Sequence, residues 1–262
     1  MSQIEIIDQH TTVGEAYMEG AEVLTPETLS GMLAGCRHTA RFISTDARND
    51  AGEWPVRSVK RLREVIEPLA GAVEGWIAVN PYYLETSLEA IRIGVQQFGM
   101  KSVGEMVQYM EDWVTDEYRV LPIVQLAGDL DVPINFHAGA AEHVEGVIHL
   151  AESYPRTRFV MAHFGGRAWR LAWRLVKDAT LPNLYVEING RPTVELAAER
   201  IAAASDAAGV DRLVLGTDFR LKTDAQYTDG NALLDALEHL GLSDAAIERI
   251  CSRNARELFK LD

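Results

Sequence analysis

The chain has 262 residues, of which 47% are hydrophobic and 24% are charged. This composition is that of an ordinary globular protein, and it excludes a disordered or collagen-like chain. The 39 acidic residues outnumber the 25 lysines and arginines, so the net charge is −14, which disfavours nucleic acid as a partner.

Eight short apolar runs predict β-strands. In chain order they are Glu5–Asp8, His38–Ser44, Val73–Val79, Ser102–Val107, Val132–Phe136, Arg158–Ala162, Leu184–Ile188 and Arg212–Gly216. Several of these runs are nearly continuous rather than alternating, which is typical of parallel strands buried on both faces.

Helical segments fall between the strands. The first opens with Thr25 as its N-cap, and the second, Trp54–Leu69, has apolar residues at helical spacing, such as Val59 and Leu62. The further segments are Leu84–Phe98, Glu117–Leu130, Val144–Ser153, Arg167–Val176, Val194–Ala207 and Asn231–Leu240, then a helix capped by Ser243 and a last one over Ser252–Leu258.

Strands that alternate with helices predict a parallel sheet. Eight units without a linker between them indicate an α/β fold of the (β/α)₈ TIM-barrel type, with residues 1–262 as a single domain. An open, doubly wound sheet is the alternative. It would be expected to carry a Gly-rich first turn, which the segment 9–14 lacks.

Three of the seven histidines, His10, His137 and His163, directly follow apolar strands, and Asp218 follows the last one. In a parallel barrel the carboxyl ends of all strands open onto one face, where the catalytic groups of this fold lie. Three imidazoles and one carboxylate suit a divalent ion such as zinc, manganese or iron. Each histidine alone is better explained as a hydrogen-bonded core residue, whereas the four together favour a metal site.

Four more residues are candidates for the same face. Glu105, near the end of the fourth strand, is either a further metal ligand or the ion-pair partner of Lys101. Tyr109 lines either a pocket or the core. Asn189 and Arg191 follow the seventh strand and are candidates for binding an anionic substrate, although Arg191 is equally well explained as a surface cation.

These motifs resemble the amidohydrolase superfamily, in particular its amidohydrolase-2 branch. The similar segments are Asp8-Gln9-His10 for the strand-1 Asp-x-His-x-His motif, Asn135-Phe136-His137 and His163-Phe164-Gly165-Gly166 for the histidines of strands 5 and 6, Gly216-Thr217-Asp218 for the strand-8 aspartate, and Asn254–Phe259 for the closing helix. The likeness extends from residue 4 to residue 260. Thr12 stands where the family has its second strand-1 histidine, and Glu105 resembles the glutamate ligand of TatD-type relatives.

The resemblance implies a metal-dependent hydrolase that acts on a small-molecule amide, ester or lactone. We expect one divalent ion, zinc rather than manganese or iron, bound by His10, His137 and Asp218, with His163 or Glu105 completing the shell. Asp218 would be the general base toward water, and His163 would stabilise the oxyanion or bind the ion. A non-oxidative decarboxylase of the same fold is the first alternative. The second is a metal-free barrel that serves as a binding or scaffold protein, because Thr12 removes one donor.

The remaining expectations concern assembly and location. Trp169 and Trp173 share one helix face, which together with the resemblance predicts a homo-oligomer, unless this face packs against the barrel. Two cysteines, Cys36 and Cys251, exclude a disulfide framework. The first residues lack the pattern of a signal peptide, and no uncharged stretch is long enough to span a bilayer, so the sequence predicts a cytoplasmic protein without a membrane partner.

Overall fold

The computed structural model describes residues 4–13, 39–46, 54–108, 113–189, 194–220 and 228–262. Within these ranges the strands form one parallel sheet with the order β8-β7-β6-β5-β4-β3-β2-β1-β9. The strands are β1 (Glu5–Val13), β2 (Thr39–Asp46), β3 (Val73–Ile77), β4 (Ser102–Met106), β5 (Ile134–Phe136), β6 (Phe159–Met161), β7 (Leu184–Ile188), β8 (Leu213–Leu215) and β9 (Phe219–Arg220). The predicted parallel sheet is confirmed, and all eight predicted strands are present; β9 is a ninth strand that the sequence did not indicate.

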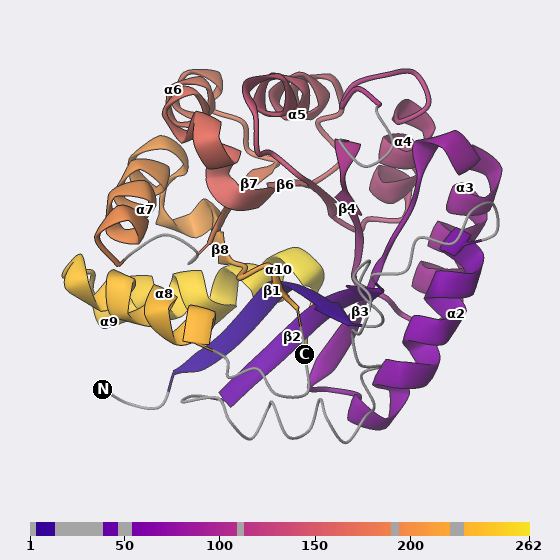
Figure 1. The fold of residues 1–262 in the computed structure, drawn as a ribbon, viewed down its shortest axis with the longest axis horizontal. Helices are drawn as coiled ribbons and strands as arrows, with labels where there is room; N and C mark the ends of the chain where they lie inside the picture. Colours follow the sequence, from indigo (N-terminus) through magenta and orange to yellow (C-terminus); the bar gives the residue numbers. More distant parts are fainter. Residues whose placement is uncertain (1–3, 14–38, 47–53, 109–112, 190–193, 221–227) are drawn as a thin grey trace.

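The two ends of this sheet belong to one short stretch of chain. Strand β8 pairs with β7 through Val214 and Glu187, and only three residues separate it from β9. Strand β9 in turn pairs with β1, where Phe219 lies opposite Thr11. The sheet is therefore strongly curled, and Figure 1 shows the helices around the outside of the curve. A doubly wound sheet, the alternative, would carry helices on both faces.

The helices alternate with the strands as expected. They are α2 (Trp54–Ile66), α3 (Leu84–Arg92), α4 (Leu121–Asp129), α5 (Ala141–Ser153), α6 (Trp169–Ala179), α7 (Val194–Ala208), α8 (Thr228–His239), α9 (Asp244–Glu248) and α10 (Asn254–Phe259). The Ser243 side chain accepts a hydrogen bond from the Ala246 amide and caps α9, as predicted. The helix expected to open at Thr25 lies outside the described residues.

One helix boundary was predicted wrongly. The expected helix over Glu117–Leu130 begins only at Leu121 in the structure. Pro122 has no N–H to donate and fits only the first turn of a helix, so α4 starts directly before it. The preceding residues form turns instead, with the Glu117 carbonyl accepting from the Val120 amide.

Two clusters of buried apolar side chains stabilise the fold. The larger one includes residues of most strands and of the helices outside the sheet. The smaller one joins Ile7, Trp76, Val160 and Val214, which come from β1, β3, β6 and β8, to the last helix α10. Helix α10 contributes Ala255, Leu258 and Phe259 to this cluster. The hydrophobic effect therefore fastens the C-terminal helix to the concave side of the sheet.

The pair of tryptophans on α6 does not form an exposed apolar face. Trp169 is buried in the larger core, with 8% of its surface exposed. Trp173 is 37% exposed, but its indole N–H donates to Asp206 of α7 at 2.8 Å. The structure thus favours the alternative in which much of this face packs against the protein. In the described part of the chain, no helix has the length and apolar character needed to cross a membrane.

Candidate metal centre

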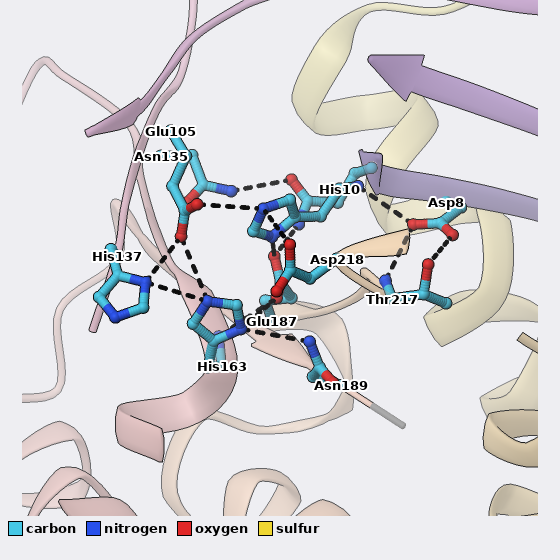
Figure 2. Close-up of polar contacts among 11 residues, drawn as sticks. Asp8, His10, Glu105, Asn135, His137, His163, Glu187, Asn189, Thr217 and Asp218 are labelled. Carbon is cyan, nitrogen blue, oxygen red and sulfur yellow. Dashed lines mark hydrogen bonds and ion pairs between the residues drawn. The ribbon is translucent and has the colours of Figure 1, made fainter. Parts of the chain in front are cut away.

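The imidazole and carboxylate groups singled out in the sequence meet inside the curve of the sheet (Figure 2). His137 directly follows β5, His163 lies in the helical turn that begins at Ala162 after β6, and Asp218 lies between β8 and β9. His10 and Glu105 lie within their strands rather than after them, because β1 continues to Val13 and β4 to Met106.

Two irregularities aim these strand residues inward. The pairing of β1 with β2 shifts register between Asp8 and Thr11, and the pairing of β4 with β5 shifts between Val103 and Met106. A bulge of this kind turns a side chain away from the alternation of the strand. It places the His10 ring among the polar groups inside the sheet, where only 2% of the side chain is exposed.

Three donor atoms form a nearly equilateral triangle. His137 Nδ1 lies 3.1 Å from Glu105 Oε1, His163 Nε2 lies 3.2 Å from the same oxygen, and the two ring nitrogens are 3.2 Å apart. One proton cannot satisfy three such lone pairs at once. Ligands at about 2.0–2.1 Å around a tetrahedral ion lie roughly 3.3 Å from one another, so the spacing suits a single bound cation.

His10 adds a fourth donor to this triangle. Its Nε2 lies 3.3 Å from Glu105 Oε2 and 3.7 Å from Asp218 Oδ1. The other ring nitrogen, Nδ1, contacts Glu187 Oε2 at 2.8 Å. Figure 2 shows the His10 ring between Glu105 and Asp218, with Glu187 beneath it. The site therefore offers imidazole nitrogens and carboxylate oxygens, the donors that zinc, manganese and iron accept.

The charges of these groups depend on one another. Burial alone would lower the pKa of His10, but the Glu187 and Glu105 carboxylates outweigh burial and hold that pKa well above its ordinary value. Burial would raise the pKa of Glu105, and His10 outweighs it and holds the pKa well below its usual range. The pKa values of His163 and Glu187 move in the same senses, upward and downward, for corresponding reasons. The cluster thus demands positive charge, which protons or a metal ion can supply.

Backbone conformation also helps to place two of the candidate donors. His163 and Asp218 have positive φ angles of 60° and 54°, a region that non-glycine residues rarely adopt. The His163 amide donates to Glu187 Oε1 at 3.2 Å. Next to Asp218, Thr217 donates to Asp8 from both its amide and its hydroxyl, at 3.0 and 2.5 Å. These buried hydrogen bonds stabilise the unusual backbone conformations at His163 and Asp218.

Not every predicted residue reaches the site. Asn189 does, because its side-chain nitrogen lies 3.2 Å from His163 Nδ1. Tyr109 and Arg191 lie outside the described residues, and so does the side chain of Thr12. His143 lies at the edge of the site with its ring 5.7 Å from that of His137, and burial together with His137 lowers the pKa of His143.

Sequence reasoning missed Glu187. This residue interrupts the apolar strand Leu-Tyr-Val-Glu-Ile, and a charged residue inside a buried run was the available signal. Gln9 and Asn135 were also passed over, although they lie beside His10 and His137 in the motifs. Asn135 donates to Gln9, and Gln9 donates to Glu187, so the three form one buried polar chain.

Comparisons with known proteins agree with this picture. The amidohydrolase family model Amidohydro_2 matches residues 46–261 of the chain, which includes Glu105 through Asp218 but begins after His10. No curated protein sequence matches the chain significantly.

Three solved structures illustrate the range of enzymes with a similar fold. A dihydroxybenzoic acid decarboxylase of Polaromonas sp. JS666, with bound manganese and the inhibitor 2-nitroresorcinol, superposes with a TM-score of 0.72 at 17% identity, over 100% of this chain and 98% of its own. The 5-carboxyvanillate decarboxylase of Sphingomonas paucimobilis gives 0.74 at 9% identity, over 99% and 100%. A Pseudomonas putida protein provisionally assigned as a 2-pyrone-4,6-dicarboxylic acid hydrolase gives 0.70 at 16% identity, over 99% of each chain.

At these identities the structural likeness shows the fold alone. The family match, in contrast, covers most of the chain and contains four of the five converging donors. The chain belongs to the amidohydrolase family of enzymes.

Proposed function

We propose that the protein is a metal-dependent hydrolase of a small molecule with an amide, ester or lactone group. The observation that carries the proposal is the triangle of Glu105 Oε1, His137 Nδ1 and His163 Nε2, whose sides measure 3.1–3.2 Å. His10 Nε2 and Asp218 extend this set. The donor set fits a divalent ion, and we propose zinc. Manganese is the alternative, because one structural neighbour contains bound manganese.

When bound, the ion supplies Lewis acidity, which polarises a carbonyl group and makes water acidic near neutral pH. The Asp218 carboxylate, 23% exposed, lies at the open side of the donors and takes the proton from the attacking water. As the water oxygen bonds to the carbonyl carbon, the carbonyl π electrons move to its oxygen. When the resulting tetrahedral intermediate re-forms its carbonyl group, the bond to the leaving nitrogen or oxygen breaks, and the leaving atom receives the proton from Asp218.

A decarboxylase of the same fold is the second candidate, favoured by the decarboxylases among the structural neighbours. In that reaction the bond between the ring carbon and the carboxylate breaks, and carbon dioxide leaves. The electron pair stays on the carbon, which takes a proton from Asp218 or His163. Both reactions use the same donors, so the products distinguish them.

The experiment combines metal and product analysis. Protein purified without chelator is analysed for zinc, manganese and iron by mass spectrometry, and then incubated with lactones, esters, amides and hydroxybenzoates. We expect about one equivalent of metal and release of an acid from a lactone, ester or amide. Release of carbon dioxide instead would support the decarboxylase. No metal and no turnover would favour the metal-free scaffold.

Our proposal includes the finer features of the fold. The pairing of β9 with β1 and of β8 with β7 supports a closed (β/α)₈ barrel that forms one domain over residues 1–262. A cytoplasmic location and a homo-oligomer remain predictions. Light scattering at micromolar concentration tests the second, and a monomer mass would contradict it.

A further inference from the structure

Two candidate donor groups overlap in the described residues. One joins His10, His163 and Glu187, and the other joins Glu105, His137 and His163. They differ in which glutamate would face the ion. We propose that Glu187 is a positioning residue, which holds the rings of His10 and His163 in place without binding the metal. This inference rests on the metal site of the proposed function.

The carboxylate oxygens of Glu187 are already occupied by contacts within the protein. Its Oε2 accepts a hydrogen bond from the side-chain amide of Gln9 and lies 2.8 Å from His10 Nδ1, and its Oε1 accepts from the His163 amide and lies 3.5 Å from His163 Nδ1. The side chain has no exposed surface. A carboxylate has about four acceptor positions, and three donors take most of them. The Gln9 and His163 amides donate, and His10 Nδ1 donates in the tautomer that carries its proton there, so the position suits an ionised carboxylate. A carboxamide would turn an NH₂ group against a donor.

Glu105 has the opposite character. In the described part of the chain its contacts are with ring nitrogens of His10, His137 and His163, and 13% of its side chain is exposed. Ring nitrogens with free lone pairs repel a carboxylate unless a cation lies between them. Glu105 would therefore face a bound cation, whereas Glu187 faces fixed donors.

Glu187 determines which nitrogen of His10 can bind metal. A proton on Nδ1 directed at Glu187 leaves the lone pair of Nε2 pointing toward Glu105 and Asp218. A carboxylate behind a histidine ligand fixes the tautomer and the ring orientation in many metal sites. The same carboxylate holds the His163 backbone at its positive φ angle, so one side chain positions two ligands.

The test compares Glu187→Gln, Glu105→Gln and the surface control Glu152→Gln. Zinc affinity is measured by competition with a chelating dye, and folding by thermal unfolding. In protein with ¹⁵N-labelled histidine, the Nδ1–H resonance of His10, assigned with His10→Gln, is recorded without and with zinc. The wild type should show a hydrogen-bonded Nδ1–H in both states, since Glu187 holds this proton whether or not metal is present.

We expect Glu187→Gln to lose this resonance and to weaken zinc binding about 10- to 100-fold. Glu105→Gln should keep the resonance and lose more affinity, and Glu152→Gln should change neither. If Glu187→Gln does not fold, Glu187→Asp replaces it, because it keeps the charge on a shorter side chain. Glu187→Asp should lose part of the Nδ1–H resonance and less zinc affinity than expected for Glu187→Gln. An unchanged resonance, an unchanged affinity, or an affinity loss equal to that of Glu105→Gln would overturn the proposal. A wild type that binds no zinc but shows the Nδ1–H refutes the metal function and leaves the role of Glu187 intact.

Discussion

Gly216 lies directly against Glu187. A Cβ atom at position 216 would be 2.6 Å from the carboxyl carbon of Glu187 and 2.7 Å from the side-chain nitrogen of Gln9. The residue directly after β8 therefore packs against the carboxylate, and any side chain there would push Glu187 away from His10.

The first prediction concerns this contact. Gly216→Ala should lower the free energy of unfolding by about 1–3 kcal/mol, because a methyl group overpacks a buried site. It should also weaken zinc binding, since Glu187 must move. Gly128→Ala is the matched control, because its Cβ would meet Thr157 Oγ1 at 2.3 Å away from the metal centre. Chemical denaturation and zinc titration of both variants give the result. Equal zinc affinity in the two variants would contradict the prediction.

The second prediction concerns His137. His137→Ala removes one corner of the donor triangle, and we expect it to retain less than about a tenth of an equivalent of metal after dialysis. His149→Ala is the control, because His149 is an exposed histidine on α5 that pairs with Asp116 outside the donor triangle. Metal analysis of both variants decides the matter. Full retention by His137→Ala would mean that the ligand assignment is wrong.

The third prediction concerns Cys251. Burial raises the pKa of this thiol to about 12, so almost none of it is thiolate at pH 8, and the thiolate is the reactive form. In a Cys36→Ser background, we expect iodoacetamide to leave the native protein unlabelled and to label it in urea. Mass spectrometry reads out the modification. Labelling of the native protein as fast as of the unfolded chain would show that Cys251 is accessible.

The fourth prediction concerns Asp131, which binds Lys260 and Arg158 near the C-terminal helix. The hydrogen bond from Lys260 and the charge of Arg158 lower the pKa of Asp131 below 3.8 against the effect of burial. A depressed carboxyl pKa stabilises the fold above the unfolded value and loses this effect as the pH falls through the folded value. Because the group is largely exposed, Asp131→Asn should cost less than about 1 kcal/mol at pH 7.

This cost should shrink as the pH falls through the folded-state pKa of Asp131, because the carboxyl of the wild type is then protonated too. Urea denaturation of both proteins at pH 7 and at the lowest pH at which both remain folded measures the difference. Arg156→Gln is a useful comparison, because its ion pair is exposed and long. The Arg156 side chain is 82% exposed, and its Nη2 lies 3.6 Å from Asp129 Oδ1, so the substitution should change the free energy of unfolding little at either pH. A difference for Asp131→Asn that stays the same at both values would show that the charge does not matter.

The sequence allowed the strands and most helices to be predicted, because buried parallel strands are continuous apolar runs and helices are periodic. It also allowed us to predict that His10, His137, His163 and Asp218 lie together, as they do in the structure, because parallel strands present their carboxyl ends on one side. The start of α4 was misplaced because the local pattern around Glu117 is compatible with a helix, while Pro122 shifts its beginning.

Glu187 could not be identified by the same reasoning. It points inward from the middle of β7, and its partners Gln9 and His163 lie 178 and 24 residues away in the chain. The inward direction of His10 likewise depends on a register shift against β2, which is a property of two paired strands and not of one segment. Periodicity within one run carries no information about such pairings.

The position of α10 has a consequence for how the protein is made. Leu258 and Phe259 pack with Ile7 and Trp76, and Trp76 in turn touches the ring of His10 with 5.0 Å between the ring centroids. The smaller cluster therefore joins β1 to α10, and it cannot be completed during translation until residue 259 has left the ribosome. Until then, the apolar side chains on the concave side of the sheet stay exposed to water.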